Sequence, residues 1–436
     1  MRSKTMRRLL VVMGFLALGG TAGVWAAKGT DRAKARPAAA KDKDKGKSGK
    51  GHVAPVTSAG GLDPFVQRGA DWLIQAQHPS GGWGAGSHAR QEVRDPRQVT
   101  TDPATTAFVA MALLRTGSTP ESGPYRESMK LATLYLVDAV EKAPRNGPRI
   151  TQIEGTQPQR KLGALVDTGM TSQYLANVLP TLAPGSALRA RVDAALEVCV
   201  RKLEDSQAAD GKWTSSGWAP VLESSVSTSA LEMAQAAGKK VDPQKLERAR
   251  EYQRKNYDAG SGRVASRDAA GVDLYAFSSA QRANAADARE AERQVQEAKN
   301  RGDLPAAAPV TVDNLKKAGL DEKRARSLND AVQSNRAQVG RMSDEQLLTG
   351  FGSNGGEEYL SYMQTSESLV LAGGNEWDLW KQKMTTRLAK IQSDDGSWTG
   401  HHCITSPVFC TAAVLQTLTA DRALLAAQPV TRVTRK

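Results

Sequence analysis

The chain of 436 residues is long enough for one to three domains of ordinary size. Hydrophobic residues make up 40% of it and charged residues 24%, a globular balance that excludes collagen-like, wholly disordered and multispanning membrane proteins. Three cysteines can form only one disulfide bridge. One bridge is too few to hold together a chain of this length, so a scaffold built on disulfides is also excluded.

The net charge of +13 is concentrated at the start of the chain. The first 51 residues hold 13 of the 59 Lys and Arg residues but only 3 of the 46 Asp and Glu residues, so the other 385 residues carry only +3. A nucleic-acid-binding protein places its basic excess on the folded surface. We therefore expect no nucleic-acid partner.

Residues 1–26 have the layout of an export signal. Four basic residues within the first eight precede an apolar stretch from residue 9 to 24, and Val24 and Ala26 are small enough for cleavage after residue 26. The stretch is near the short end of what spans a bilayer, so an uncleaved N-terminal anchor is the alternative. Either form predicts an exported protein of the periplasm or cell envelope, and the anchored form predicts proximity to a membrane.

Residues 27–60 consist mainly of Ala, Lys, Asp, Gly, Ser and Pro, with almost no large apolar side chain. Such a segment cannot bury enough surface to offset the entropy lost on ordering. We expect a disordered basic linker there, and a short basic tail at residues 423–436.

From residue 61 to 422 the apolar pattern is helical, so we expect an all-α domain. Longer, more charged helices alternate with helices of few charges, which predicts an outer and an inner helix in each of six hairpins. The outer helices are expected at residues 62–77, 124–141, 187–206, 243–256, 325–340 and 376–391. The inner helices are expected at residues 101–116, 167–182, 220–237, 270–282, 357–372 and 404–420. Hairpins of this kind bury their faces only against neighbours, and six of them predict a closed ring. Residues 283–341, rich in Ala, Arg and Glu, are expected to form a helical insertion outside that ring.

A short motif marks the end of three outer helices. Each copy has Leu, Gln, Gly and Trp at the same spacing: Leu73, Gln77, Gly81 and Trp83; Leu203, Gln207, Gly211 and Trp213; Leu388, Gln392, Gly396 and Trp398. The Leu anchors the last helical turn, the Gly permits the positive φ of a tight turn, and the Trp covers the helix end. The Gln amide can satisfy backbone groups left without partners at the helix end.

The first copy, extended by Arg68, Gly69 and Trp72, matches all seven specified positions of a repeat found in two enzyme groups. These are the squalene and oxidosqualene cyclases and the β subunits of protein prenyltransferases. The Trp398 copy keeps five positions and the Trp213 copy keeps four. Residues 61–422 therefore resemble an α/α toroid of that superfamily, and the C-terminal third resembles exported bacterial proteins with the same repeat. A shared fold does not by itself give a function.

The catalytic residues that the resemblance implies have no counterpart in this sequence. Cyclases of the superfamily protonate an alkene with an Asp-x-Asp-Asp motif, which is absent; the one adjacent Asp pair, Asp394 and Asp395, lies in the third motif turn. Only 22 of 436 residues are aromatic, which is few for a cavity that stabilises carbocations. Prenyltransferases hold zinc with Asp, Cys and His, and their Asp-x-Cys pair is absent too.

A polar cluster is nevertheless expected near the last two inner helices. The carboxylates are Glu357 and Glu358, and the candidate metal ligands are His401, His402, Cys403 and Cys410. This inventory suits zinc, but its spacing matches no closed zinc motif. We favour a disulfide between Cys403 and Cys410, which would exclude zinc; unlinked thiols are the third alternative.

Acidic residues also stand at the starts of other inner helices. Asp102, Asp167 and Glu223 occupy positions where N-capping explains them fully. In a ring, the same three residues would surround one mouth together with Glu357 and Glu358. These five are the candidate catalytic residues, and their charge would repel a diphosphate.

Three functions follow from these features. The first is an exported toroid whose central cavity binds an apolar or isoprenoid-like small molecule. The second is a divergent, zinc-assisted enzyme of the cyclase and prenyltransferase superfamily, and the third is an envelope scaffold that binds a protein or a glycan. A cavity lined by Leu, Met and Phe would favour a lipid, whereas polar lining would favour a glycan or protein. The sequence leaves the ligand, the reaction and the oligomeric state open.

Overall fold

The computed structural model describes residues 61–213 and 216–422, which lie within one compact unit, Ala54–Lys436. The predicted export signal, linker and tail lie outside the described residues. Within the described part the chain forms 15 α-helices and one short two-stranded hairpin. This confirms the all-α fold class.

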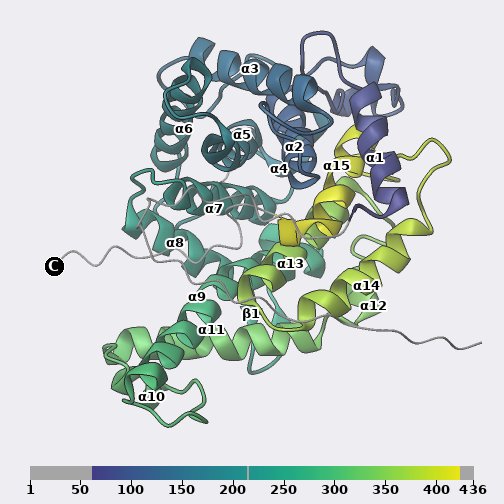
Figure 1. Cartoon of the computed structure of the whole chain (residues 1–436). Coiled ribbons are helices and arrows are strands. Elements are labelled where there is room, and N and C mark those ends of the chain that lie inside the picture. Colours follow the sequence, from purple (N-terminus) through teal and green to yellow (C-terminus); the bar gives the residue numbers. More distant parts are fainter. Residues whose placement is uncertain (1–60, 214–215, 423–436) are drawn as a thin grey trace, which may run out of the picture. The chain divides into compact units, whose positions relative to one another are not determined.

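Six helices form an inner ring (Figure 1). In chain order they are α2 (Pro103–Arg115), α5 (Val166–Val178), α7 (Pro220–Ala236), α9 (Asp273–Arg301), α13 (Gly356–Ala372) and α15 (Pro407–Leu418). Each packs against the next one in this order, and α15 returns to pack against α2. The ring is therefore closed, which confirms the α/α toroid. Because ring neighbours and outer helices cover them, inner helices such as α2 and α15 are buried on nearly every side.

Six outer helices surround this ring. They are α1 (Pro64–Gln75), α3 (Arg126–Lys142), α6 (Ala187–Asp205), α8 (Pro243–Arg254), α11 (Glu322–Gly340) and α14 (Glu376–Ala389). Each is amphipathic; α1, for example, buries Val66, Ala70 and Leu73 at helical spacing. Some outer helices lie against two inner helices: α6 packs against both α5 and α7, and α14 against both α13 and α15.

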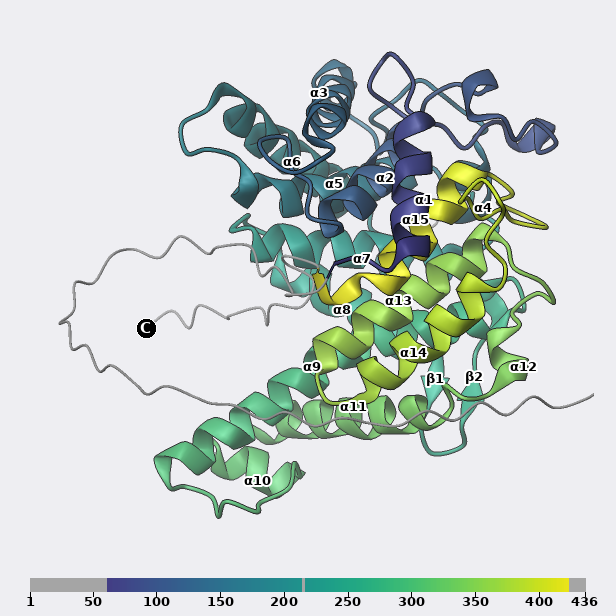
Figure 2. The same cartoon turned by 45° about the vertical axis from the view of Figure 1, so that its right-hand side comes forward.

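The fourth inner helix is longer than predicted. We expected it to end at residue 282, but α9 continues without a break to Arg301. The reason is that α11 runs back along it, and the two bury an apolar cluster with the segment between them. Its members are Ala288, Ala291, Val295, Ala298, Leu304, Val310, Leu315, Ala325, Leu328 and Val332. In Figures 1 and 2 this part of α9 and α11 extends away from the ring, with α10 (Val312–Lys317) at its far end.

The three motif copies make the same contacts. Each Trp is buried, and its indole N–H donates to the Leu carbonyl ten residues earlier at 2.7 to 2.9 Å. The three Gly residues have φ between 87° and 95°. Each Gln donates to the Gly carbonyl of its own turn and to a carbonyl at the start of the next outer helix: Ser128, Lys245 and Phe65 in turn. The Gln residues thus join neighbouring outer helices as well as completing their own helix ends.

The third copy joins the end of the described chain to its beginning. Gln392 donates to the Phe65 carbonyl in α1 at 2.8 Å, and the Trp72 indole of α1 donates to Asp395 at 3.0 Å. Both contacts span more than 320 residues of sequence. They close the outer layer at the same place where α15 meets α2.

The remaining elements are short. They are α4 (Gln157–Leu162), α12 (Glu345–Leu348), the antiparallel strands β1 (Tyr257–Asp258) and β2 (Arg263–Val264), and the 3₁₀ turns His88–Arg90, Pro96–Gln98, Leu179–Thr181, Arg267–Ala269 and Ala420–Arg422. Among the described residues, no helix combines the length and the apolar character needed to cross a membrane.

Candidate functional site

Buried acids lie where inner helices begin, at an end of the ring that we call the N-terminal mouth. Asp102 caps α2 by accepting a backbone N–H of its first turn. Asp167 of α5 accepts the Ala104 N–H of α2 at 3.0 Å, and Glu223 of α7 accepts the Leu165 N–H before α5 at 3.0 Å. The structure therefore brings these three predicted residues to one end of the ring. Their capping extends to neighbouring helices, which the sequence did not indicate.

Glu358, in the first turn of α13, is held by three donors. It accepts the Gly355 N–H at 2.9 Å, the Phe351 N–H at 3.1 Å and the Tyr275 hydroxyl at 2.5 Å. The Nε2 of His402 lies 3.6 Å from its second oxygen. Glu358 thus has a structural role at the mouth, because both of its carboxylate oxygens already accept hydrogen bonds.

Two fully buried side chains at the mouth keep one polar atom each without a protein partner. Glu357 accepts the Ile404 N–H at 3.2 Å through Oε2, but its Oε1 has none. Gln157 of α4 accepts the Thr405 and Ser406 N–H groups at 2.7 and 3.2 Å, but its Nε2 has none. Both side chains hold the segment that leads into α15. Glu357 Oε1 and Gln157 Nε2 are therefore buried polar atoms without a protein partner.

Burial raises the pKa of three carboxyl groups at the mouth. The pKa of Asp102 is raised to about 6, and that of Asp167 to about 7 by burial and then by the charge of Asp102. Burial, followed by the neighbouring Glu358, raises the pKa of Glu357 to about 8. Glu357 is therefore mostly uncharged at neutral pH and can donate as well as accept a hydrogen bond.

Aromatic and basic side chains form the rim of the mouth. Trp218 is 40% exposed and Phe351 is 56% exposed, and their ring centres lie 5.8 Å apart. The ammonium group of Lys161, in α4, lies 4.8 Å from the centre of the Trp218 ring. On the other side, the His402 ring lies 5.3 Å from Phe351. Exposed aromatic rings of this kind often mark a binding surface.

The two cysteines near the mouth are free thiols, so the structure does not contain the disulfide that we favoured. The Cys410 thiol is fully buried and points to the Ile404 carbonyl, with sulfur and oxygen 3.6 Å apart. Cys403 is half-buried in the preceding loop, with φ of 58°. Burial and the charge of Glu357 raise the pKa of Cys403 to about 12, and burial raises that of Cys410 well above its usual range.

The predicted zinc ligands do not come together as a metal site. His401 is exposed, while His402 lies beside Glu358 and interacts with the rim. Across residues 61–213 and 216–422, no three or more His, Cys, Asp or Glu side chains are grouped so that they could hold a metal ion. The residues present do not fit zinc.

Several residues of the mouth were not predicted. Gln157, Lys161, Tyr275, Trp218 and Phe351 all contribute to it, and the first two belong to α4, which we did not expect. One signal was available, because Thr156 and Gln159 form a capping box that begins this helix. The others lie in loops or on α9, where only the tertiary fold shows what they face.

Comparisons with known proteins establish neither a family nor a function. No protein-family model matches the sequence, and no curated protein matches it significantly. Among solved structures, the chain is similar to the type II terpene cyclase MstE from Scytonema in its apo form. The identity is 12% and the TM-score 0.31, over 81% of this chain and 96% of that one. A second structure of MstE, in complex with its product merosterolic acid A, gives 12% identity and a TM-score of 0.32 over 82% and 96%. The closed ring of this chain is established by the contacts between its own helices.

Proposed function

We propose that the chain is an exported binding protein whose N-terminal mouth takes a hydroxyl-rich ligand, such as a sugar unit of a glycan. The observation that carries this proposal is that one end of the ring has two buried groups without partners, Gln157 Nε2 and Glu357 Oε1, and a rim with the exposed Trp218 and Phe351 rings. A hydroxyl group both donates and accepts, so one ligand can satisfy both partners. The exposed ring faces suit the C–H faces of a sugar.

An isoprenoid ligand, which the resemblance implied, fits these groups less well. A hydrocarbon chain offers nothing to Gln157 or Glu357, and a buried polar atom left unpaired costs about 1–3 kcal/mol. The polar composition of the mouth therefore favours the glycan alternative over the lipid alternative. The zinc-assisted enzyme is not favoured either, because its metal ligands are not grouped.

The exported location in this proposal, the periplasm or cell envelope, is supported by the sequence outside the described residues. An export signal in residues 1–26 followed by a basic linker would place the ring in the envelope on a tether. Glycan polymers are abundant in that compartment, and a tethered ring could reach them.

The proposal is tested with two ligand series. Purified protein is titrated with cello-oligosaccharides and chito-oligosaccharides, and separately with farnesol, by calorimetry. We expect saturable binding of at least one oligosaccharide series and none of farnesol. Trp218→Ala and Phe351→Ala should each weaken oligosaccharide binding about tenfold or more, equivalent to about 1.4 kcal/mol.

The matched control is Leu379→Ala, because Leu379 is 69% exposed on α14, away from the residues of the mouth. This variant should bind like the unaltered protein. Absence of oligosaccharide binding, equal affinity in all three variants, or farnesol binding that Trp218→Ala removes would each contradict the proposal.

A further inference from the structure

A chain of five alternating charges crosses the toroid near the C-terminal ends of several inner helices, opposite the mouth. We call it the central charge chain, and in order its members are Arg115, Glu367, Arg282, Glu232 and Arg250. They come from α2, α13, α9, α7 and α8. All five side chains are buried.

The pairing along the chain is uneven. Arg115 binds Glu367, Arg282 binds Glu232 at 2.8 Å, and Arg250 binds Glu232 at 2.7 Å. The link between Arg282 Nε and Glu367 is 4.0 Å, which is too long for a hydrogen bond. Glu367 therefore accepts a hydrogen bond from Arg115 but not from Arg282.

Three guanidinium nitrogens of the central charge chain have no protein acceptor. They are Nε of Arg115 and both Nε and Nη1 of Arg282. Arg115 is 2% exposed and Arg282 is 3% exposed, so bulk water does not reach either freely. The nearby acid Asp287 does not supply the missing acceptors, because it is held by Arg254 at 2.8 Å and Arg324 at 2.9 Å.

Charges of both signs are buried here. Three arginines face two glutamates in the chain itself, and the buried Asp287 adds a third acid whose charge acts on Arg250. Buried charges in proteins are normally paired, and arginine binds planar oxyanions with two parallel hydrogen bonds. The unpaired guanidinium donors of Arg115 and Arg282 therefore suit an oxyanion acceptor.

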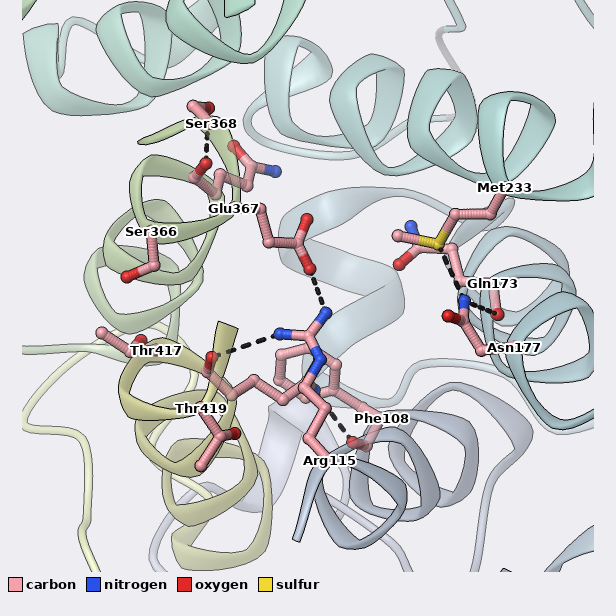
Figure 3. Close-up of polar contacts among 12 residues, drawn as sticks. Phe108, Arg115, Gln173, Asn177, Met233, Ser366, Glu367, Ser368, Thr417 and Thr419 are labelled. Atoms are coloured by element: carbon pink, nitrogen blue, oxygen red, sulfur yellow. Dashed lines mark hydrogen bonds and ion pairs between the residues drawn. The ribbon is translucent and has the colours of Figure 1, made fainter. Parts of the chain in front are cut away.

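Figure 3 shows the surroundings of one end of this chain. Arg115 from α2 and Glu367 from α13 meet in the space between the inner helices, and Asn177 and Met233 point toward it from α5 and α7. Arg115 also donates to the Gln416 carbonyl at 3.2 Å, and Asn177 donates to the Gln173 carbonyl at 2.8 Å. Gln173 is half-buried and donates to the Val226 carbonyl of α7 at 2.8 Å.

We infer that Arg115 and Arg282 form a binding site for a small oxyanion, a carboxylate or a phosphate group, in the centre of the toroid. Glu367 lies between the two arginines and occupies part of the site as an internal carboxylate. A ligand oxyanion would take the donors that Glu367 leaves free. The site lies at the opposite end of the inner helices from the mouth and does not depend on the proposed glycan binding.

The inference is tested by calorimetric titration of the full-length protein with inorganic phosphate and, separately, acetate. Chloride replaces the anion at constant ionic strength in the reference titration. We expect one saturable site for one of the two oxyanions, and the stronger of the two identifies the ligand class. Arg115→Lys and Arg282→Lys, which keep the charge but lose the planar fork, should each weaken this binding at least tenfold.

For Glu367→Gln we expect the opposite change in oxyanion affinity. Removing the internal carboxylate frees both arginines, so oxyanion binding should tighten at least tenfold. Arg191→Lys is the matched control, since Arg191 pairs with Asp138 and Glu141 on the surface and should leave binding unchanged.

Two results would overturn the inference. One is the absence of saturable binding in both the unaltered protein and Glu367→Gln, and the other is equal binding in the unaltered protein and both lysine variants. Thermal unfolding checks that each variant is folded. If the lysine variants unfold, the Glu367→Gln titration alone decides: tighter binding supports the site and unchanged or absent binding rejects it.

Discussion

Burial gives the carboxyl groups of the mouth a chemistry that their residue type does not indicate. Glu357 has no solvent exposure, one backbone donor and an acidic neighbour, and its pKa is raised to about 8. The pKa values of Asp102 and Asp167 are also raised, and burial is again the main cause. The folded protein therefore prefers these groups protonated, whereas the unfolded chain ionises them near pH 4.

This preference predicts how stability depends on pH. A carboxyl group whose pKa is raised on folding stabilises the protein below the unfolded pKa, and that stability is lost as pH rises through the folded pKa. For Asp102, Asp167 and Glu357 the loss falls between about pH 4 and pH 8. We expect the melting temperature to fall by several degrees, at about 2–4 °C for each kcal/mol, between pH 5 and pH 8.5.

The variant Glu357→Gln isolates one of these groups. An amide of the same shape can accept the Ile404 N–H but cannot ionise, so the decline in melting temperature between pH 5 and pH 8.5 should be shallower. A melting temperature that rises over this range, or the same slope in both proteins, would show that the carboxyl groups are not held protonated.

At the scale of elements, the turn after an outer helix packs closely against the backbone of the next outer helix, and this contact requires a glycine. Gly211 has φ of 91°, and a Cβ there would lie 2.2 Å from the Arg248 carbonyl oxygen in α8. Gly238 has nearly the same φ, 88°, but a Cβ there would meet nothing within 4 Å. The two positions share a positive φ and differ in what a Cβ would meet.

Substitution of these two glycines separates backbone strain from packing. Gly238→Ala should cost about 1–2 kcal/mol for the left-handed conformation. Gly211→Ala should cost that amount and about 1–3 kcal/mol more, because the added methyl group displaces α8. Urea unfolding measures both free energies, and equal losses would mean that the turn does not pack against α8 as described.

The helices were largely predictable because their signals are local. The pair Asp102 and Pro103 caps and starts α2 as the sequence indicates. The length of α9 was not predictable, because its extension is stabilised by α11 across an apolar cluster that residue spacing alone does not reveal. The strands β1 and β2 were missed because two residues each are too few to show a strand pattern.

The site was less predictable than the helices. The sequence indicated which acids stand at inner-helix starts, and the structure places Asp102, Asp167 and Glu223 there. It did not indicate that Asp167 and Glu223 cap neighbouring helices about 60 residues away. Nor did it indicate the rim, because Trp218 and Phe351 become neighbours only through the fold.

At the scale of the whole molecule, closure of the ring creates both proposed sites. The mouth combines α4, α7 and α13 with the loop before α15, and the central charge chain combines α2, α7, α8, α9 and α13. Neither set is local in sequence. An open row of hairpins would separate α2 from α15 and leave α1 without the third motif turn.

Closure of the ring is tested most directly by crosslinking α1 to the third motif turn, which contains Asp395. In a Cys403→Ser background, whose other cysteines are buried, Trp72→Cys and Asp395→Cys replace two side chains that are hydrogen bonded at 3.0 Å. A pair with Asp210→Cys in place of Asp395→Cys is the control, because Asp210 precedes Gly211 as Asp395 precedes Gly396. A short bis-maleimide should join residues 72 and 395 within one chain, detected by peptide mass, and should not join residues 72 and 210. No intramolecular crosslink to residue 395, or equal crosslinking to residue 210, would contradict the closed toroid.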